Sequence, residues 1–320
     1  MDWYPLLLTP YLKETLWGGT RLLTDFGFSS EGPSTGEAWL LSCRPDGPSV
    51  VHNGPLAGCP LSEVLAEWGA AALGRRAAGF PGFPLLVKLI DAQAPLSLQV
   101  HPNDAYAART EGGRGKAEMW YVVDCEPGAK LVYGVNCGLT RGEFRRHAEE
   151  GTLADICNVV PAHPGDVFFL PAGTLHSVGA GILLAEIQQN SDITYRVYDY
   201  GRVDLDGRPR PLHIDKAVEA VITVPPQIPY GAVGRVSSLP GGTVRPLASC
   251  DWFQAELLAV SGGMRIGCAD SFICLICLKG EGALIWTGGE IPLCKGTCLF
   301  LPAGMTALAK GELQLLCSRV

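Results

Sequence analysis

The sequence lacks the features that mark membrane, secreted and nucleic-acid-binding proteins. No apolar run approaches the roughly 20 residues that a membrane-spanning helix needs, and the net charge of −7 gives no general attraction to nucleic acid or to an anionic membrane. The N-terminal segment 1–5 has neither a basic stretch nor a long apolar stretch, so no secretory signal is expected. We therefore predict a cytoplasmic protein that binds neither membrane nor nucleic acid. An anionic ligand would need a local cluster of positive charge.

The composition is that of a globular protein rich in turns. The chain has 320 residues, of which 47% are hydrophobic and 18% charged, and it contains 40 Gly and 24 Pro, as all-β folds with many tight turns require. Its 12 cysteines are scattered, and most lie inside apolar runs. Cys274 and Cys277 have the spacing of a redox or metal pair, but residues three apart on a strand face opposite sides. We predict buried free thiols.

Short apolar runs bounded by turn residues dominate the pattern and predict strands. The clearest runs cover 85–90, 120–123, 167–170 and 182–185. Helices are few: we expect one over about 63–77 with Ser62 as its N-cap, one over about 140–155 that opens with the capping box Thr140 and Glu143, and one over about 214–219.

An internal repeat gives the strongest indication of the domain organisation. Residues 165–173 align without gaps to residues 296–304, and six of the nine positions are identical. Extending this alignment matches His176 with Ala307, and a looser upstream alignment matches Glu118 with Ser271. Residues needed only for folding would be expected in both copies. We therefore predict two related β-barrels, one active and one structural, with the helix at 140–155 inserted in the first.

The composition changes near 224–249, where prolines and glycines accumulate. We predict a catalytic metal-binding domain over 1–224, a linker over 225–249 and a degenerate barrel without metal ligands over 250–320.

A set of polar side chains in the first copy has the spacing of a metal site. The pattern Gly165-x5-Pro171-x-Gly173-x2-His176 resembles the second sequence motif of cupins, and Gln99-Val100-His101 stands where that class usually has His-x-His. Gln99 and His101 are two apart on an expected strand and so face the same side. Glu118 begins the next strong strand. These observations predict a mainly β fold of two cupin-type (jelly-roll) barrels, with a few helices in and around the N-terminal barrel.

The four candidate ligands, Gln99, His101, Glu118 and His176, supply nitrogen and oxygen donors. Such a set suits one Zn²⁺ per chain with open positions for catalysis. Two histidines and a carboxylate could equally hold Fe²⁺, and at this point both metals stay open.

Several longer motifs resemble those of one family, the type I phosphomannose isomerases in their short Gram-positive form. They are Leu16-Trp17-Gly18-Gly19, Gly36-Glu37-Ala38-Trp39, Leu96-Ser97-Leu98-Gln99-Val100-His101-Pro102, Gly115-Lys116-Ala117-Glu118-Met119-Trp120-Tyr121 and the segment Ser191 to Arg202. The resemblance is dense from about residue 5 to 222 and looser in the C-terminal part. The chain lacks the long helical insertion of other members.

The resemblance implies a zinc-dependent aldose–ketose isomerase that interconverts mannose 6-phosphate and fructose 6-phosphate through a cis-enediol. It implies Gln99, His101, Glu118 and His176 as zinc ligands, Arg196 as a catalytic residue, and Lys88, Ser97 and Lys116 as substrate or phosphate contacts. Lys116 is also a candidate for the general base, beside a zinc-bound water or an acidic side chain. The expected partner is a small sugar phosphate, and the expected assembly is a monomer or a weak homo-oligomer.

Three further expectations follow from single residues or from rival classes. Glu37 is interpreted as a turn-flanking acid in preference to an active-site rim residue, and Trp17 and Trp39 as core packing. His213, with the other remaining histidines, has no ligand partner at strand spacing. The rival functions are another metal-dependent cupin enzyme, such as an Fe²⁺ oxygenase, and a non-catalytic sugar-phosphate sensor.

Overall fold

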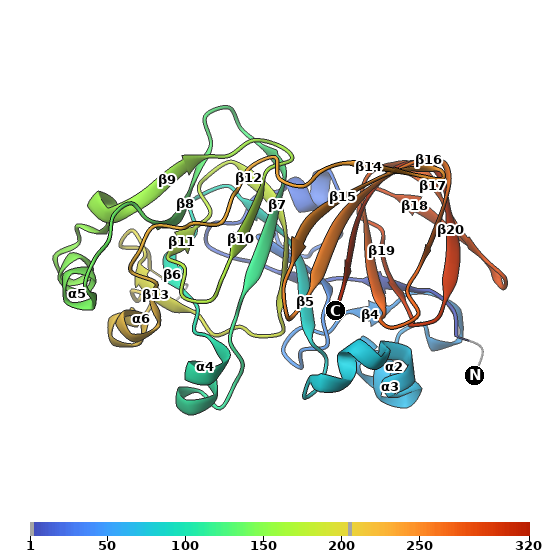
Figure 1. Cartoon of the computed structure of the whole chain (residues 1–320), viewed down its shortest axis with the longest axis horizontal. Coiled ribbons are helices and arrows are strands. Elements are labelled where there is room, and N and C mark those ends of the chain that lie inside the picture. The colour runs from blue at the N-terminus through green and yellow to red at the C-terminus, as the bar shows by residue number, and fades with distance from the viewer. Residues whose placement is uncertain (1–2, 204–206) are drawn as a thin grey trace.

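The computed structural model describes residues 3–203 and 207–320, and its regular structure is mainly β-sheet. Figure 1 shows two β-structures side by side, with helices at the left-hand end and along the bottom. In the described residues the strands are β1 Leu6–Thr9, β2 Tyr11–Lys13, β3 Glu37–Leu41, β4 Val50–Val51, β5 Leu85–Ala92, β6 Leu98–Val100, β7 Glu118–Cys125, β8 Lys130–Val135, β9 Cys157–Pro161, β10 Val167–Leu170, β11 His176–Ser177, β12 Ile182–Gln189, β13 Tyr195–Tyr198, β14 Ser237–Leu239, β15 Gly242–Ser249, β16 Gln254–Gly267, β17 Ile273–Trp286, β18 Gly289–Cys294, β19 Cys298–Leu301 and β20 Thr306–Arg319.

The helices are short. They are α1 Arg21–Thr24, α2 Leu61–Trp68, α3 Ala70–Leu73, α4 Asp104–Thr110, α5 Arg141–Glu150 and α6 Ile214–Ala220, with 3₁₀ turns at Gly54–Leu56, Arg75–Gly79 and Leu153–Ile156. In the described part of the chain no helix is both long and apolar enough to cross a membrane.

The N-terminal β-structure is a sandwich of two sheets. One sheet has the strand order β10-β7-β12-β5-β3-β2 and the other has the order β13-β6-β11-β8-β9. Apolar side chains of both sheets meet between them, among them Trp120, Tyr133, Phe168 and Leu184. The outer face of the second sheet is covered by α5 and α6 through residues such as Phe144 and Val218.

The C-terminal β-structure is a single curled sheet with the order β14-β15-β16-β20-β17-β19-β1-β4, and β18 pairs with β17. Its interior is filled by apolar side chains, including Ile266, Ile273 and Ala307. Neither β-structure closes hydrogen-bond by hydrogen-bond into a full barrel, but both have the jelly-roll arrangement predicted from the sequence. The expected fold class is confirmed.

The internal repeat is visible in the backbone. Gly165 and Gly296 have φ +91° and +93°, and Gly173 and Gly304 have φ +94° and +81°, so the glycines occupy left-handed turn positions in both copies. Between them lie β10 and β19, which pair antiparallel with β7 and β17. The repeat therefore encodes one strand with the same turn at either end.

The strand pairing corrects one alignment made from the sequence. Leu170 faces Glu118 across the β10–β7 pair, and the equivalent Leu301 faces Ile273 across β19–β17. The structural counterpart of Glu118 is thus Ile273, not Ser271. The looser upstream alignment was displaced by two residues because apolar strands of period two match almost equally well at that shift.

The helix expected over 63–77 is also corrected. It begins at Leu61, after Pro60, so Ser62 is not its N-cap. Gly69 and Gly74, with φ +70° and +83°, break the stretch into α2, α3 and a 3₁₀ turn. The helix after Thr140 has the predicted capping box, but it ends at Glu150 because Gly151 is left-handed.

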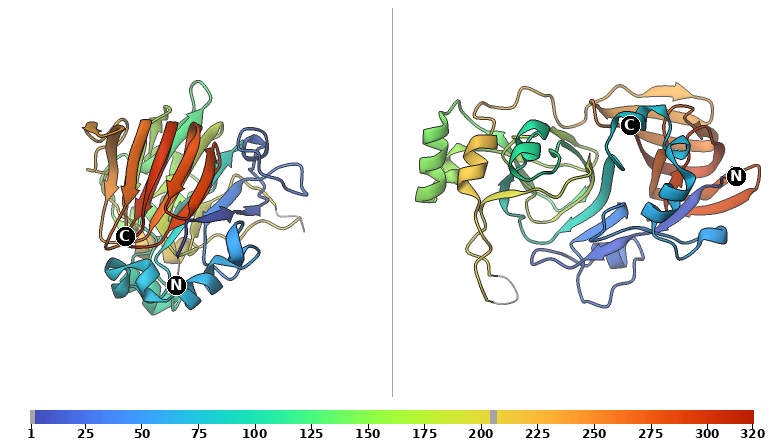
Figure 2. Two further views of the ribbon diagram at one scale, coloured as in Figure 1. Left: turned by 90° about the vertical axis from the view of Figure 1, so that its right-hand side faces the viewer. Right: turned by 90° about the horizontal axis from the view of Figure 1, so that it is seen from below.

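The stretch expected as a linker is partly sheet. Residues 225–236 connect the two β-structures, as the views of Figure 2 show, but β14 and β15 fall within 237–249 and pair with each other and with β16. β1, from the expected first domain, pairs with β19 in the curled sheet. The division into domains 1–224 and 250–320 stays a prediction.

Cys274 and Cys277 are buried free thiols, as predicted. Cys274 packs in the core between the two β-structures, and Cys277 packs inside the curled sheet. The strand therefore points them to opposite sides.

Candidate active site

The candidate site lies inside the N-terminal sandwich, and strand register places its residues. On β5, β7 and β12 every second side chain faces the interior, so Glu186 lies opposite both Lys88 and Trp120 in its neighbouring strands, and Gln188 lies opposite Glu118. β5 and β12 are buried on both faces along their whole length, and β7 is buried over its first five residues. Their charged residues are therefore held in a largely water-free interior.

The facing sheet contributes the remaining donors. His176 on β11 lies opposite Gln99 on β6, and Gln99 in turn lies opposite Arg196 on β13. His101 follows the end of β6. The three expected ligand positions Gln99, His101 and His176 therefore come together although 75 residues of sequence separate the last two.

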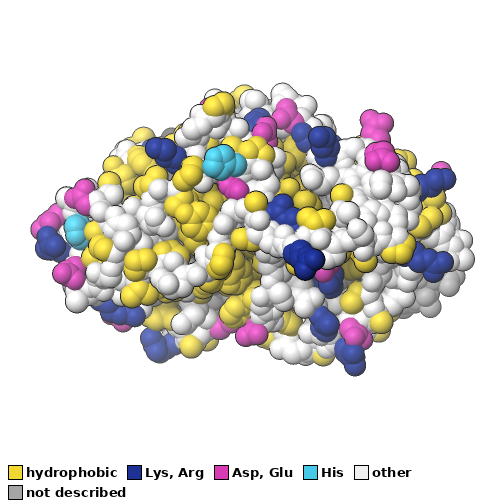
Figure 3. Space-filling model, turned by 45° about the horizontal axis from the view of Figure 1, so that its top comes forward, with side chains coloured by type: hydrophobic (Ala, Val, Ile, Leu, Met, Phe, Trp, Pro, Cys, Tyr) yellow, Lys and Arg dark blue, Asp and Glu magenta, His cyan; other side chains and the backbone are white. Residues whose placement is uncertain are grey.

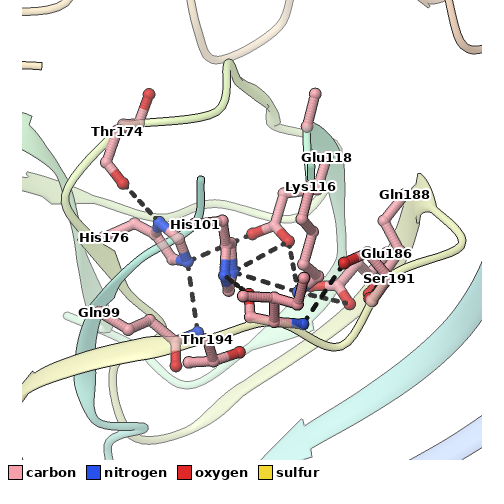
Figure 4. Close-up of polar contacts among 12 residues, drawn as sticks. Gln99, His101, Lys116, Glu118, Thr174, His176, Glu186, Gln188, Ser191 and Thr194 are labelled. Atoms are coloured by element: carbon pink, nitrogen blue, oxygen red, sulfur yellow. Dashed lines mark hydrogen bonds and ion pairs between the residues drawn. The ribbon is translucent and has the colours of Figure 1, made fainter. Parts of the chain in front are cut away.

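Two histidines and one carboxylate form a compact cluster. Ligand atoms of His101, Glu118 and His176 all lie within 4.8 Å of one another. Nε2 of His101 is 3.5 Å from one oxygen of Glu118, and Nε2 of His176 is 3.4 Å from the other. All three side chains are almost completely buried. Figure 4 shows them pointing toward one another.

Hydrogen bonds to backbone carbonyls fix which nitrogen each histidine presents to Glu118. Nδ1 of His101 lies 2.9 Å from the carbonyl of Ile193, and Nδ1 of His176 lies 2.8 Å from the carbonyl of Thr174. A carbonyl only accepts, so each Nδ1 carries the proton and each Nε2 offers a lone pair toward Glu118. Metal-binding histidines are typically oriented in this way.

The carboxylate of Glu118 and the amide of Gln99 lie on either side of His176. Oε1 of Glu118 is buried and accepts no hydrogen bond among the described residues, which fits a carboxylate that binds a cation. Gln99 lies on the other side of His176, with its amide nitrogen 3.3 Å from Nε2 of that ring. Its amide oxygen accepts a hydrogen bond from Ser97 at 3.3 Å. The residues present therefore fit a metal ion.

Burial keeps both imidazoles neutral. Loss of solvent lowers the pKa of His176 to about 4. The same effect, with the nearby charge of Lys116, lowers the pKa of His101 well below its ordinary value. Neutral imidazole is the form that binds a metal ion.

A row of alternating acidic and basic side chains continues from the cluster toward the mouth of the site. It consists of Glu118, Lys116, Glu186, Lys88 and Glu37. Lys116 lies 2.8 Å from Oε2 of Glu118 and 3.1 Å from Nε2 of His101. Lys88 lies 3.3 Å from both Glu37 and Glu186.

The two buried carboxylates of this row differ in pKa. Loss of solvent and the charge of Glu186 raise the pKa of Glu118. Burial also opposes ionisation of Glu186, but the charges of Lys116 and Lys88 and a 3.0 Å hydrogen bond from Trp120 lower its pKa below the usual range.

A cavity of about 690 Å³ opens onto this row of charges. Its lining includes five residues expected from the sequence: Lys88, Ser97, Gln99, Lys116 and Arg196. His101, Glu118 and His176 are buried beside it. All candidate site residues are thus brought into one region, and the roles assigned to them stay predictions.

Three cavity residues were missed or interpreted differently from the sequence. Glu37 is an interior charge paired with Lys88, although it was interpreted as a turn-flanking acid. Glu186 lies within an apolar run on β12, where only its period-two relation to Leu184 signals an inward position. His213 lines the cavity, and its Nδ1 accepts a 3.3 Å hydrogen bond from the backbone N–H of Arg196. A ring that contacts backbone from a loop leaves no strand-spacing signal.

The tryptophans are core residues that also border the site. Trp17 and Trp39 are 6% and 2% exposed, so the prediction of core packing is confirmed. The ring of Trp39 lies 5.3 Å from the Lys88 ammonium, and its indole N–H donates to Glu37 at 2.7 Å. Trp39 therefore contacts both members of the Lys88–Glu37 ion pair and helps to hold them in place.

Comparison with known proteins agrees with this site. Residues 6–126 match the model of the phosphomannose isomerase type I catalytic domain, and residues 244–320 match that of the mannose-6-phosphate isomerase cupin domain. Mannose-6-phosphate isomerase ManA of Bacillus subtilis is 39% identical over 97% of this chain and 95% of its own.

The chain belongs to the type I phosphomannose isomerase family.

Further relatives cover the chain from end to end. Mannose-6-phosphate isomerase of Streptococcus mutans is 36% identical over 98% of both chains. The crystal structure of the mannose 6-phosphate isomerase from Bacillus subtilis superimposes with a TM-score of 0.92 at 36% identity, over 99% of this chain and 100% of that one. The family expected from the sequence is confirmed, and neither rival class is favoured.

Proposed function

We propose that this protein interconverts mannose 6-phosphate and fructose 6-phosphate through a cis-enediol. The observation that carries the proposal is the buried cluster of His101, Glu118 and His176 at the base of a cavity, in a chain of this family. The relatives named above bear that activity in their names. The substrate is a small sugar phosphate.

Zinc is the ion that we propose for the cluster, one per chain. Gln99, His101, Glu118 and His176 would hold it, because neutral imidazoles with a carboxylate and an amide are nitrogen and oxygen donors of the kind zinc accepts. When bound, the ion polarises substrate oxygens and neutralises part of the charge that develops on them.

Arg196 is proposed to stabilise the enediolate. It lies opposite Gln99 in the sheet, so its side chain leaves the strand on the same face as a proposed ligand. A guanidinium stays charged and offers a planar set of donors to the two oxygens on C1 and C2.

Lys116 is proposed as the second catalytic residue, moving a proton between C1 and C2. It is 5% exposed and lies between the carboxylates of Glu118 and Glu186, at 2.8 and 3.9 Å. Lys88 and Ser97 line the same cavity, and we propose that they contact the substrate with Lys116.

We further propose that the enzyme works in the cytoplasm as a monomer or a weak homo-oligomer. On the face shown in Figure 3, basic and acidic side chains are interspersed, without a basic region of the kind that binds nucleic acid.

The test is turnover of mannose 6-phosphate before and after chelation, with zinc and iron added back separately. We expect activity to vanish with the chelator and to return with zinc. Folded, zinc-replete protein without turnover would refute the isomerase proposal and favour a sensor. Oxygen consumption by the iron-loaded protein would favour an oxygenase instead.

A further inference from the structure

Three arginines gather around one buried carboxylate at the mouth of the cavity. Asp199 is 5% exposed, and it accepts hydrogen bonds from Arg202 and from Arg210. Arg196 lies next to them and lines the cavity with Arg210. Among the described residues, this group carries three positive charges against the one negative charge of Asp199.

The single carboxylate of Asp199 does not neutralise the three arginines. The pKa of Arg196 is lowered by burial and by the charge of Arg210, and the attraction of Asp199 does not offset this. Nε of Arg196 is buried and has no hydrogen-bond partner among the described residues, while Nη1 donates to the carbonyl of Pro211 at 3.1 Å. A buried, unpaired guanidinium N–H is costly unless an acceptor binds to it.

Arg210 is held with donors to spare. Its Nε and Nη2 donate to the two oxygens of Asp199 at 2.6 and 2.5 Å. A guanidinium has five N–H groups, so this bidentate pair leaves both N–H groups of Nη1 for a further acceptor. Asp199 thus fixes the plane of Arg210 beside the cavity that Arg196 also lines.

The inner end of the cavity has the opposite balance. Lys88 and Lys116 face the three carboxylates of Glu37, Glu118 and Glu186 at 2.8 to 3.9 Å. Without a bound metal ion, a phosphate dianion placed there would meet an excess of carboxylates in a poorly solvated interior, where repulsion is strong. With the ion bound, the phosphate would compete with the sugar oxygens for it. The arginine group at the mouth offers it an excess of positive charge instead.

We infer that Arg210, beside Arg196, forms the subsite that binds the phosphate of the sugar phosphate, and that Asp199 positions Arg210, while Arg196 stays available for the enediolate. This inference rests on the proposed function. A hexose 6-phosphate carries its phosphate at the far end of the carbon chain from C1 and C2. Binding the phosphate at the mouth therefore places C1 and C2 toward the histidine cluster, with Lys88, Ser97 and Lys116 left to contact the sugar oxygens.

The test compares Arg210→Met with Arg202→Met. Both variants remove one partner of Asp199 and keep an apolar stem. Arg202 is the matched control because it donates to the carbonyl of Pro95 at 2.7 Å and is not among the residues that line the cavity. Melting temperature and metal content establish that each variant is folded and loaded.

The first measurement is binding of inorganic phosphate to chelator-treated protein by calorimetry, so that phosphate bound to a metal ion does not contribute. We expect Arg210→Met to weaken binding roughly 10- to 100-fold, the range for a charge-assisted hydrogen bond, and Arg202→Met to change it much less. Equal weakening in both variants, or none in Arg210→Met, overturns the inference.

The second measurement is steady-state kinetics with mannose 6-phosphate. Arg210→Met should raise KM by a similar factor and leave kcat within a few-fold, because the phosphate contact is present in both ground and transition states. A fall in kcat at unchanged KM would place Arg210 in the chemistry and overturn the subsite.

The isomerase proposal and the phosphate-subsite inference can be refuted independently of each other. Phosphate binding that depends on Arg210, in a protein that does not turn over mannose 6-phosphate, would keep the anion subsite and refute the isomerase. Turnover that is insensitive to Arg210→Met would keep the isomerase and refute the subsite.

Discussion

The role of a charged side chain in this protein depends on the residues around it, as Arg196 and Glu37 show. Arg196 was expected to be catalytic from its motif, and the structure places it opposite Gln99, with its Nε–H unpaired among the residues that the structure describes. Glu37 comes from an equally recognisable motif but was interpreted as a turn-flanking acid. Only the fold shows it paired with Lys88.

Replacing Arg196 by Ala is expected to lower kcat by about 10²- to 10³-fold while zinc content stays near that of the parent. The reason is that Arg196 would contact the developing enediolate without being a metal ligand. Turnover and metal analysis on the same preparation measure both quantities, with Arg196→Lys as the charge-preserving control. A parallel loss of zinc and activity would show that Arg196 has a structural role.

Glu37 should contribute to stability above acid pH. Burial opposes its ionisation, but Lys88, Lys13 and the Trp39 indole outweigh this and lower its pKa below the ordinary 4.5. A lowered folded-state pKa stabilises the protein above the unfolded value, and this contribution disappears as pH falls through the folded value. The free energy of unfolding of Glu37→Gln should therefore fall less steeply than that of the parent below about pH 4.5.

Urea titrations of both proteins between pH 7 and pH 3 measure that difference. Parallel curves would show that Glu37 has the same pKa in the folded and unfolded states.

At the scale of elements, the repeated strand with its glycine turns is the unit from which both β-structures are built. Gly173 and Gly304 take the same left-handed conformation, but their surroundings differ. A Cβ on Gly173 would lie 2.7 Å from the carbonyl oxygen of Ala220, whereas a Cβ on Gly304 would meet nothing within 4 Å. The turn was duplicated with the strand, and the packing around it was not.

Gly173→Ala should therefore destabilise the protein more than Gly304→Ala. Both substitutions carry the left-handed backbone cost of about 1–2 kcal/mol, and Gly173→Ala adds steric strain of about 1–3 kcal/mol. Thermal or urea unfolding of the two variants gives the comparison directly. An equal decrease in the free energy of unfolding of both variants would mean that the end of α6 moves away from the new methyl group without destabilising the protein.

The duplicated elements also show which residues the second β-structure has in place of the donor set. Through the strand pairs, Gln99, Glu118 and His176 correspond to Ile266, Ile273 and Ala307. All three counterparts pack in the apolar interior of the curled sheet. A site whose residues fit a cation in one copy is ordinary hydrophobic core in the other.

At the scale of the whole molecule, the two β-structures share a core. Leu40 and Val87 of the N-terminal sandwich pack in one cluster with Phe272 and Phe300 of the curled sheet. The thiol of Cys298 donates to the carbonyl of Leu40, and β1 of the N-terminal segment pairs with β19. Each β-structure would expose its side of this apolar cluster to water if the other were absent.

We therefore expect a single cooperative unfolding transition, with tryptophan fluorescence and far-ultraviolet circular dichroism giving the same midpoint. The fragment 1–224 should not fold when it is expressed alone, because it would expose its side of the shared core. Two separated transitions, or a folded metal-binding fragment, would show instead that the parts are independent.

The sequence by itself determined the fold class, the four candidate ligands and the family, because strand periodicity, Pro/Gly turns and the contrast between two copies are local signals. It also indicated that only one copy carries the donor set. The tertiary structure decided what depends on distant segments: the inward position of Glu37 and Glu186, the pairing of β1 with β19, and the arginines around Asp199. Their interactions join residues far apart along the chain, and a strand's own pattern does not state which strand will lie beside it.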